Sequence, residues 1–102
     1  MALPARNHRI TLKDAAALAR RHREAHPAGK FAGGSFHALQ VLELLQQPDC
    51  VALRIYLGLE DDGLTLILVG VDDTDKDMVQ GTILEQPYKC PPICGISGPL
   101  NS

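Results

Sequence analysis

The feature that most constrains the fold is a pair of apolar segments joined by an acidic turn that ends in glycine. From residue 51 to 59 every second residue is large and apolar, which is the period of a strand with one buried face: Val51, Leu53, Ile55, Leu57 and Leu59. Glu60-Asp61-Asp62-Gly63 then supplies turn residues, and Gly63 can take a positive φ without steric cost. Residues 64–71 form a second apolar run. The sequence therefore predicts an antiparallel hairpin with strands at about 51–59 and 64–71.

The second of these strands carries apolar side chains on both faces, with leucines at 64, 66 and 68 on one side and branched residues on the other. This pattern predicts a central strand with something packed on each face. Two helices can cover only one face, so the other face needs the tail or another subunit. The candidate interaction residues of the hairpin are Tyr56, Ile67, Val69 and Val71. A third strand is expected over about 79–85, weakened by Gly81.

Two helices are predicted ahead of the hairpin. Thr11 can cap a helix over about 11–25, and Ser35 can cap a second over about 35–47, which Pro48 ends. The second helix has the wider apolar stripe. These 102 residues are expected to form a single domain of the α+β class, with both N-terminal helices packed on one face of a small two- or three-stranded antiparallel sheet. The tail over 87–102 contains four prolines and is expected to be irregular.

Charge is distributed unevenly along the chain. Residues 1–30 contain seven Lys or Arg and two Asp or Glu, whereas residues 31–102 contain three and ten. Arg20, Arg21 and Arg23 form a basic cluster that is a candidate interaction site, with a protein partner or another copy of the chain as the expected ligand. A pI near 6.0 and the lack of Trp argue against nucleic acid. No segment approaches the roughly 20 apolar residues of a membrane span, and no export signal is visible, so we expect a cytoplasmic protein.

The three cysteines are candidates for metal or redox chemistry. Cys90 and Cys94 are separated by three residues, a spacing found in structural zinc sites, and Cys50 could be a third ligand. Because the second close pair of a typical site is missing, we expect no bound cofactor, and zinc is the one metal that these thiols could hold. A Cys90–Cys94 disulfide is possible if the Cα atoms come within roughly 7 Å. Cys50 can equally be a small buried residue.

An acidic turn after the second strand resembles the first half of a calcium loop. Asp73, Asp75 and Asp77 alternate as calcium ligands do. The pattern fails at its sixth and twelfth positions, which are Met78 and Leu84 instead of glycine and glutamate. We therefore expect a solvated acidic turn.

A little over half of the chain resembles a group of small bacterial proteins that have no assigned activity. They are single domains that end in a Cys-Pro-Pro-X-Cys tail. The residues that carry the resemblance are Gln47-Pro48-Asp49-Cys50, Arg54-Ile55-Tyr56-Leu57-Gly58, Leu68-Val69-Gly70-Val71-Asp72, Gly81-Thr82-Ile83 and Cys90-Pro91-Pro92-Ile93-Cys94. The resemblance implies a shared fold with cysteines in matching places, and no catalytic residue.

No nucleophile, base and orienting acid can be assembled from the sequence, so we predict no enzymatic activity. The expected function is a non-enzymatic binding or self-assembly module. The alternative is a small metal-binding or thiol redox-sensing protein that uses Cys50, Cys90 and Cys94.

Overall fold

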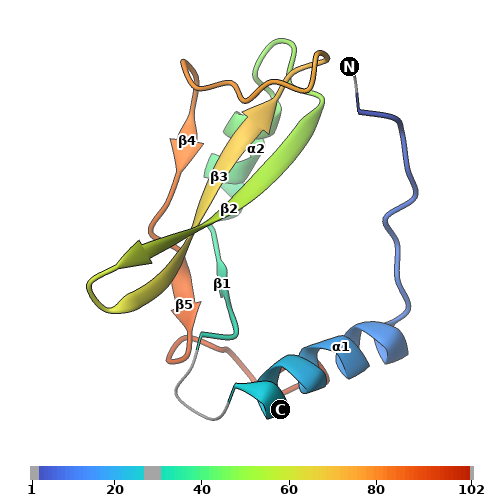
Figure 1. The fold of residues 1–102 in the computed structure, drawn as a ribbon, viewed down its shortest axis with the longest axis vertical. Coiled ribbons are helices and arrows are strands. Elements are labelled where there is room, and N and C mark those ends of the chain that lie inside the picture. The colour runs from blue at the N-terminus through green and yellow to red at the C-terminus, as the bar shows by residue number, and fades with distance from the viewer. Residues whose placement is uncertain (1–2, 27–30, 102) are drawn as a thin grey trace. The chain divides into compact units, whose positions relative to one another are not determined.

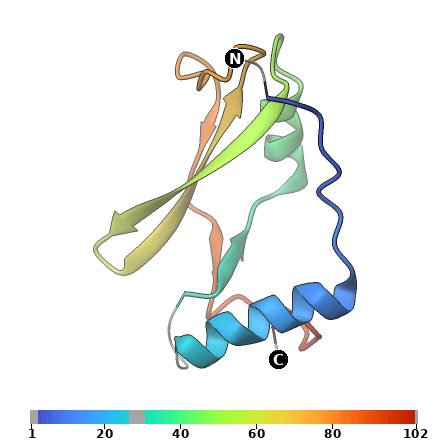
Figure 2. The same ribbon diagram turned by 45° about the vertical axis from the view of Figure 1, so that its right-hand side comes forward.

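The computed structural model describes residues 3–26 and 31–101, which belong to two compact units. The first unit contains residues 3–5 and Ser35–Pro87, and the second contains residues 6–26, 31–34 and 88–101 (Figures 1 and 2). The α+β class with a small antiparallel sheet is confirmed. No helix in the described ranges is long and apolar enough to cross a membrane.

The first unit is built on a three-stranded antiparallel sheet in the order β2-β3-β4. Its strands are β2 (Ala52–Glu60), β3 (Gly63–Val71) and β4 (Ile83–Leu84). The predicted hairpin is confirmed to within one residue at each strand end, and Gly63 takes the expected positive φ of 124°. The central position of β3 is confirmed as well.

Helix α2 (Ala38–Leu45) packs on β3 and β4 and buries Leu44 completely. It is shorter than the predicted 35–47, and the prediction that Ser35 caps it is wrong. Ser35 is extended in strand β1 (Gly33–Ser35), and the cap is His37, whose Nδ1 accepts a hydrogen bond from the Leu39 N–H at 3.2 Å.

The third predicted strand is shorter than 79–85 because residues 78–81 form a turn, in which the Gly81 N–H donates to the Met78 carbonyl. Gln47 holds the end of this turn, since its Oε1 accepts a hydrogen bond from the Thr82 N–H at 2.8 Å. A Cβ atom at Gly81 would collide with the same Oε1 atom. Glycine at position 81 therefore makes room for the Gln47 side chain.

The core of the first unit lies around the second half of β3. The buried apolar side chains are Leu44, Leu68, Val69 and Val71. Thr65 is also buried, and its hydroxyl donates to Glu85 at 2.7 Å. Since successive residues of a strand point to opposite faces, burial of residues 68–71 confirms that both faces of β3 are covered at this end.

The second unit contains helix α1 (Leu12–Ala25), strand β5 (Tyr88–Cys90) and residues 33–34 of β1, which pairs with β5 in a two-stranded sheet. Thr11 caps α1 as predicted and accepts from the Asp14 N–H at 3.1 Å. Packing on the three-stranded sheet is thus described for α2, whereas α1 belongs to the other unit and has no buried residue.

The tail is less irregular than predicted because β5 pairs with β1. The Cys90 carbonyl accepts from the Ala32 N–H at 2.8 Å. Farther along, the Leu100 carbonyl accepts from Arg23 Nη1 of α1 at 2.7 Å, so the tail joins the helix to the small sheet.

Candidate functional site

One face of the β2–β3 hairpin is the candidate site. The register places Leu53 opposite Gly70, and the same face carries every second residue from these positions toward the hairpin turn. A Cβ at Gly70 would lie 3.0 Å from Cys50 Sγ and 3.2 Å from Gln47 Nε2. The turn that follows α2 therefore packs on this face at the Gly70 end.

Toward the hairpin turn the same face is uncovered. Ile55 is 56% exposed, Leu57 68%, Leu59 83% and Leu64 43%. We call these four side chains the hairpin patch. They are neighbours, because the register pairs Leu59 with Leu64 and alternate residues of β2 share the face.

The length of α2 explains why the patch is exposed. A helix of eight residues is about 12 Å long, whereas strands of nine residues extend about 30 Å. Helix α2 can therefore cover less than half of the hairpin, and it lies at the end away from the hairpin turn (Figures 1 and 2). An apolar face longer than its helix leaves the remainder open to a partner.

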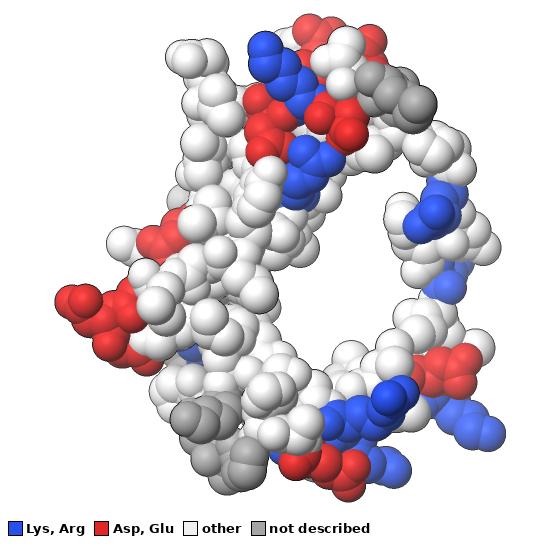
Figure 3. Space-filling model, viewed as in Figure 1, with Lys and Arg blue, Asp and Glu red and all other residues white. Residues whose placement is uncertain are grey.

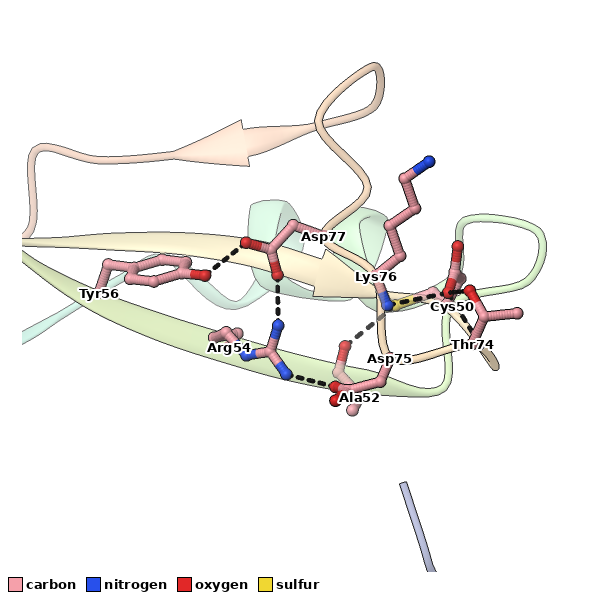
Figure 4. Close-up of polar contacts among 9 residues, drawn as sticks. Cys50, Ala52, Arg54, Tyr56, Thr74, Asp75, Lys76 and Asp77 are labelled. Atoms are coloured by element: carbon pink, nitrogen blue, oxygen red, sulfur yellow. Dashed lines mark hydrogen bonds and ion pairs between the residues drawn. The ribbon is translucent and has the colours of Figure 1, made fainter. Parts of the chain in front are cut away.

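The opposite face of the hairpin carries a polar cluster that joins β2 to the loop after β3 (Figure 4). Arg54 donates from Nη2 to Asp75 at 2.5 Å and from Nη1 to Asp77 at 2.6 Å. Tyr56 donates its hydroxyl to the other oxygen of Asp77 at 2.5 Å. Asp77 is itself bridged to Val71, so the cluster lies directly over the edge of the core.

The electrostatics of this cluster follow from its hydrogen bonds. The pKa of Asp77 is lowered, first by the hydrogen bond from Tyr56 and then by Arg54. The pKa of Tyr56 is raised, because its proton is held by the Asp77 carboxylate. The pKa of Arg54 is raised by hydrogen bonds to Asp75 and Asp77. The cluster therefore stabilises the charged forms of Asp77 and Arg54 and the neutral form of Tyr56.

Asp72 shapes the loop that presents these carboxylates. Its Oδ1 accepts from the Thr74 hydroxyl at 2.7 Å, the Thr74 N–H at 2.9 Å and the Lys76 N–H at 3.1 Å, which lowers the pKa of Asp72. Asp75 takes a positive φ of 64° in this loop. The expectation of a merely solvated acidic turn misses that two of its carboxylates bind Arg54.

The predicted cysteine set is divided between the units. Cys90 and Cys94 form a disulfide with a Cα–Cα distance of 4.7 Å in the second unit, as the sequence allowed. Cys50 is a free, partly buried thiol in the first unit, and its Sγ donates to the Ala52 carbonyl at 3.4 Å. Within the described ranges, no group of three or more His, Cys, Asp or Glu is placed to hold a metal ion.

The predicted interaction residues of the hairpin do not form one exposed surface. Val69 and Val71 are core residues, Ile67 is partly buried, and Tyr56 is exposed but bonded to Asp77.

The basic residues Arg20, Arg21 and Arg23 lie on α1, where Lys and Arg side chains gather in Figure 3. The structure does not bring them into the same unit as the hairpin.

Sequence reasoning missed the hairpin patch as a site, although its alternating pattern was recognised. The signal that could have found it is the length of the apolar helical run, which is limited by Pro48 on one side and by three glycines on the other.

No protein-family model matches this chain, no curated protein matches it, and no solved structure matches it.

Proposed function

We propose that this chain is a non-enzymatic protein-interaction module that self-assembles through the hairpin patch. The observation that carries the proposal is the exposure of four neighbouring large apolar side chains on a regular strand pair. Burial of apolar surface is the main favourable term in protein association, and contiguous exposed apolar patches mark interaction sites.

The small core supports the same proposal. Among the described residues, only four large apolar side chains are buried, although 45% of the chain is hydrophobic. A small domain that buries little apolar surface by itself gains stability when association buries more. Self-assembly would therefore contribute to the stability of the folded chain.

The polar cluster supports a structural role for the charged residues of the first unit. The Arg54 guanidinium is shared by two carboxylates, and the Tyr56 hydroxyl is donated to one of them. These bonds connect a strand to a loop more than 20 residues away in the sequence. The cluster therefore serves to hold β2, and with it the patch, in place.

Light scattering after size-exclusion chromatography tests the proposal over a range from about 1 to 200 µM, around the micromolar affinities of modest interfaces. We expect the wild-type mass to rise above 11.0 kDa with concentration, and Leu57→Asp to remain monomeric because it places a charge in the patch. The matched control is Ile96→Asp, which changes a 95% exposed residue outside the patch and should assemble like the wild type. A wild-type chain that stays monomeric throughout would overturn the proposal.

A second candidate function, thiol redox sensing, is favoured by the Cys90–Cys94 disulfide. Cys90 ends strand β5 and its carbonyl accepts from the Ala32 N–H, whereas the Cys94 carbonyl accepts from Asn101 Nδ2 at 2.6 Å. The disulfide thus connects two anchor points of the second unit. In a reducing compartment such a bond forms reversibly, with two electrons and two protons passing to a disulfide oxidant.

Thiol counting during titration with defined ratios of reduced and oxidised glutathione tests this candidate. A sensor should convert between one and three free thiols within the range of cellular glutathione potentials. A disulfide that stays closed, or stays open, across that whole range would exclude the sensing function.

A further inference from the structure

We infer that the Cys90–Cys94 disulfide controls the attachment of the C-terminal tail to α1, and that Asn101 transmits this control. This inference rests on the second candidate function, thiol redox sensing, and names the structural change that the sensor produces. All of the contacts that carry it lie within the second unit.

The tail has no apolar anchor of its own. Among the described residues, none from 88 to 101 is buried, and the side chains of Ile93, Ile96 and Leu100 are exposed. Burial of apolar surface is the main term that fixes a segment on a protein, and it contributes little here. The conformation of the tail therefore depends on the disulfide and on hydrogen bonds.

Asn101 makes the hydrogen bonds that close the end of the tail. Its Nδ2 donates to the carbonyl of Cys94 at 2.6 Å and to that of Ile96 at 3.2 Å. Its Oδ1 accepts from the Gly98 N–H at 2.6 Å. One partly buried amide group thus ties three positions of the tail together, using both its donor and its acceptor atoms.

The residue before Asn101 is the one that α1 binds. Arg23 Nη1 donates to the Leu100 carbonyl at 2.7 Å, across 77 residues of sequence. Arg23 is partly buried, whereas Arg20 and Arg21 are exposed, and the tail runs beside α1 in both views (Figures 1 and 2). Because Leu100 is the neighbour of Asn101, the contact with Arg23 depends on the Asn101 hydrogen bonds.

The disulfide fixes the carbonyl that Asn101 binds. It holds the Cα atoms of Cys90 and Cys94 4.7 Å apart, and Cys90 is itself held in β5. Two backbone hydrogen bonds also close this loop, from the Ile93 N–H to residue 89 and from the Cys94 N–H to residue 92. Such bonds exchange with water at little net cost, whereas the covalent bond does not.

Reduction therefore releases the tail. A dithiol transfers two electrons and two protons to the disulfide, so that the S–S bond breaks, two cysteine thiols form and the dithiol becomes a disulfide. The Cys94 carbonyl is then no longer held beside β5, and Asn101 loses the partner at that position. The oxidation state thus decides whether Arg23 is bonded to the tail or is added to the exposed basic residues of α1.

Amide hydrogen exchange measured by NMR tests the coupling in three samples: the disulfide-bonded protein, the same protein reduced with dithiothreitol, and Cys90→Ser/Cys94→Ser. Exchange at the Gly98 amide should be about tenfold faster in the last two. The matched control is the Thr82 amide of the first unit, which also donates to a side-chain amide oxygen, that of Gln47, and should not change. The chemically reduced wild type decides the result if the double variant fails to fold.

Asn101→Ala tests the role of Asn101, because coupling between two sites is reciprocal. If the Asn101 hydrogen bonds favour the closed disulfide, their loss should make the disulfide about fivefold easier to reduce in a glutathione titration. Asn7→Ala is the matched control. Asn7 belongs to the same unit and bonds only to the nearby Arg9 N–H in the described contacts, so its loss should leave the titration unchanged.

The outcomes separate this inference from the sensing function. Faster Gly98 exchange on reduction, together with easier reduction of Asn101→Ala, supports the inference. Equal Gly98 exchange with and without the disulfide overturns it, even where the thiols convert within the cellular range of glutathione potentials. A disulfide that dithiothreitol opens with faster Gly98 exchange, but that does not convert within that range, supports the coupling and overturns the sensing function.

Discussion

Truncation of Leu59 to alanine gives the sharpest quantitative test of the hairpin patch. Leu59 is 83% exposed in the isolated chain, so nearly all of its apolar surface is available to a partner. The substitution removes about three methylene equivalents at ~0.8 kcal/mol each, or about 2 kcal/mol per copy after allowing for the exposed fraction. A contact between two patches loses this contribution twice, about 4 kcal/mol, which corresponds to a roughly 1,000-fold larger dissociation constant.

Sedimentation equilibrium of wild-type and Leu59→Ala protein measures that dissociation constant directly. Urea unfolding at concentrations where both proteins are monomeric provides the folding control. The unfolding midpoint should be the same for both, because the side chain is exposed in the monomer and its loss leaves no cavity. Ile96→Ala is the matched substitution, since it truncates an exposed branched side chain outside the patch and should leave the dissociation constant unchanged.

A Leu59→Ala dissociation constant within about threefold of the wild type would refute the reasoning, because threefold corresponds to only about 0.7 kcal/mol. A large shift in the monomer's unfolding midpoint would refute the premise that Leu59 is exposed, since it would show that Leu59 is packed within the monomer.

Three further predictions concern contacts that lie within one unit or the other. Gly81→Ala should lower the free energy of unfolding by about 1 kcal/mol, because it displaces the Gln47 side chain from its hydrogen bond, and the loss should be smaller in a Gln47→Ala background. Since the pKa of Asp77 is lowered in the fold, its stabilising contribution is present above the ordinary carboxyl pKa of 3.8 and is lost as pH falls through the folded value; Asp77→Asn should flatten acid unfolding over that range and lower the pKa of Tyr56 in a phenolate absorbance titration. Reduction of the tail disulfide should speed hydrogen exchange at the Ala32 amide, which is bonded to the Cys90 carbonyl, and unchanged protection there would show that the strand pair does not depend on the disulfide.

The sequence predicted those elements that are determined by residues close together in the chain. The alternation in 51–59 and the turn at Gly63 determine the hairpin, and Thr11 determines where α1 begins. The polar cluster could not be predicted in the same way. Arg54 and Asp77 are separated by 23 residues, and nothing near either one indicates the other. Their pairing depends on the loop that Asp72 folds, in which Asp75 takes a positive φ.

The hairpin patch lies between these two cases. Alternation shows which residues share a face, but whether that face is buried depends on how far the covering helix extends. The extended segment ending at Ser35, the cap at His37 and the stop at Pro48 limit α2 to eight residues. These three features are local, but they predict the length of α2 only if the helix boundaries are known to within a residue or two. A helix two turns longer, about 11 Å, would cover most of the exposed half of the hairpin. The length of α2 therefore decides whether the hairpin is a closed core or a surface for assembly, and lengthening α2 should weaken self-assembly as it stabilises the monomer.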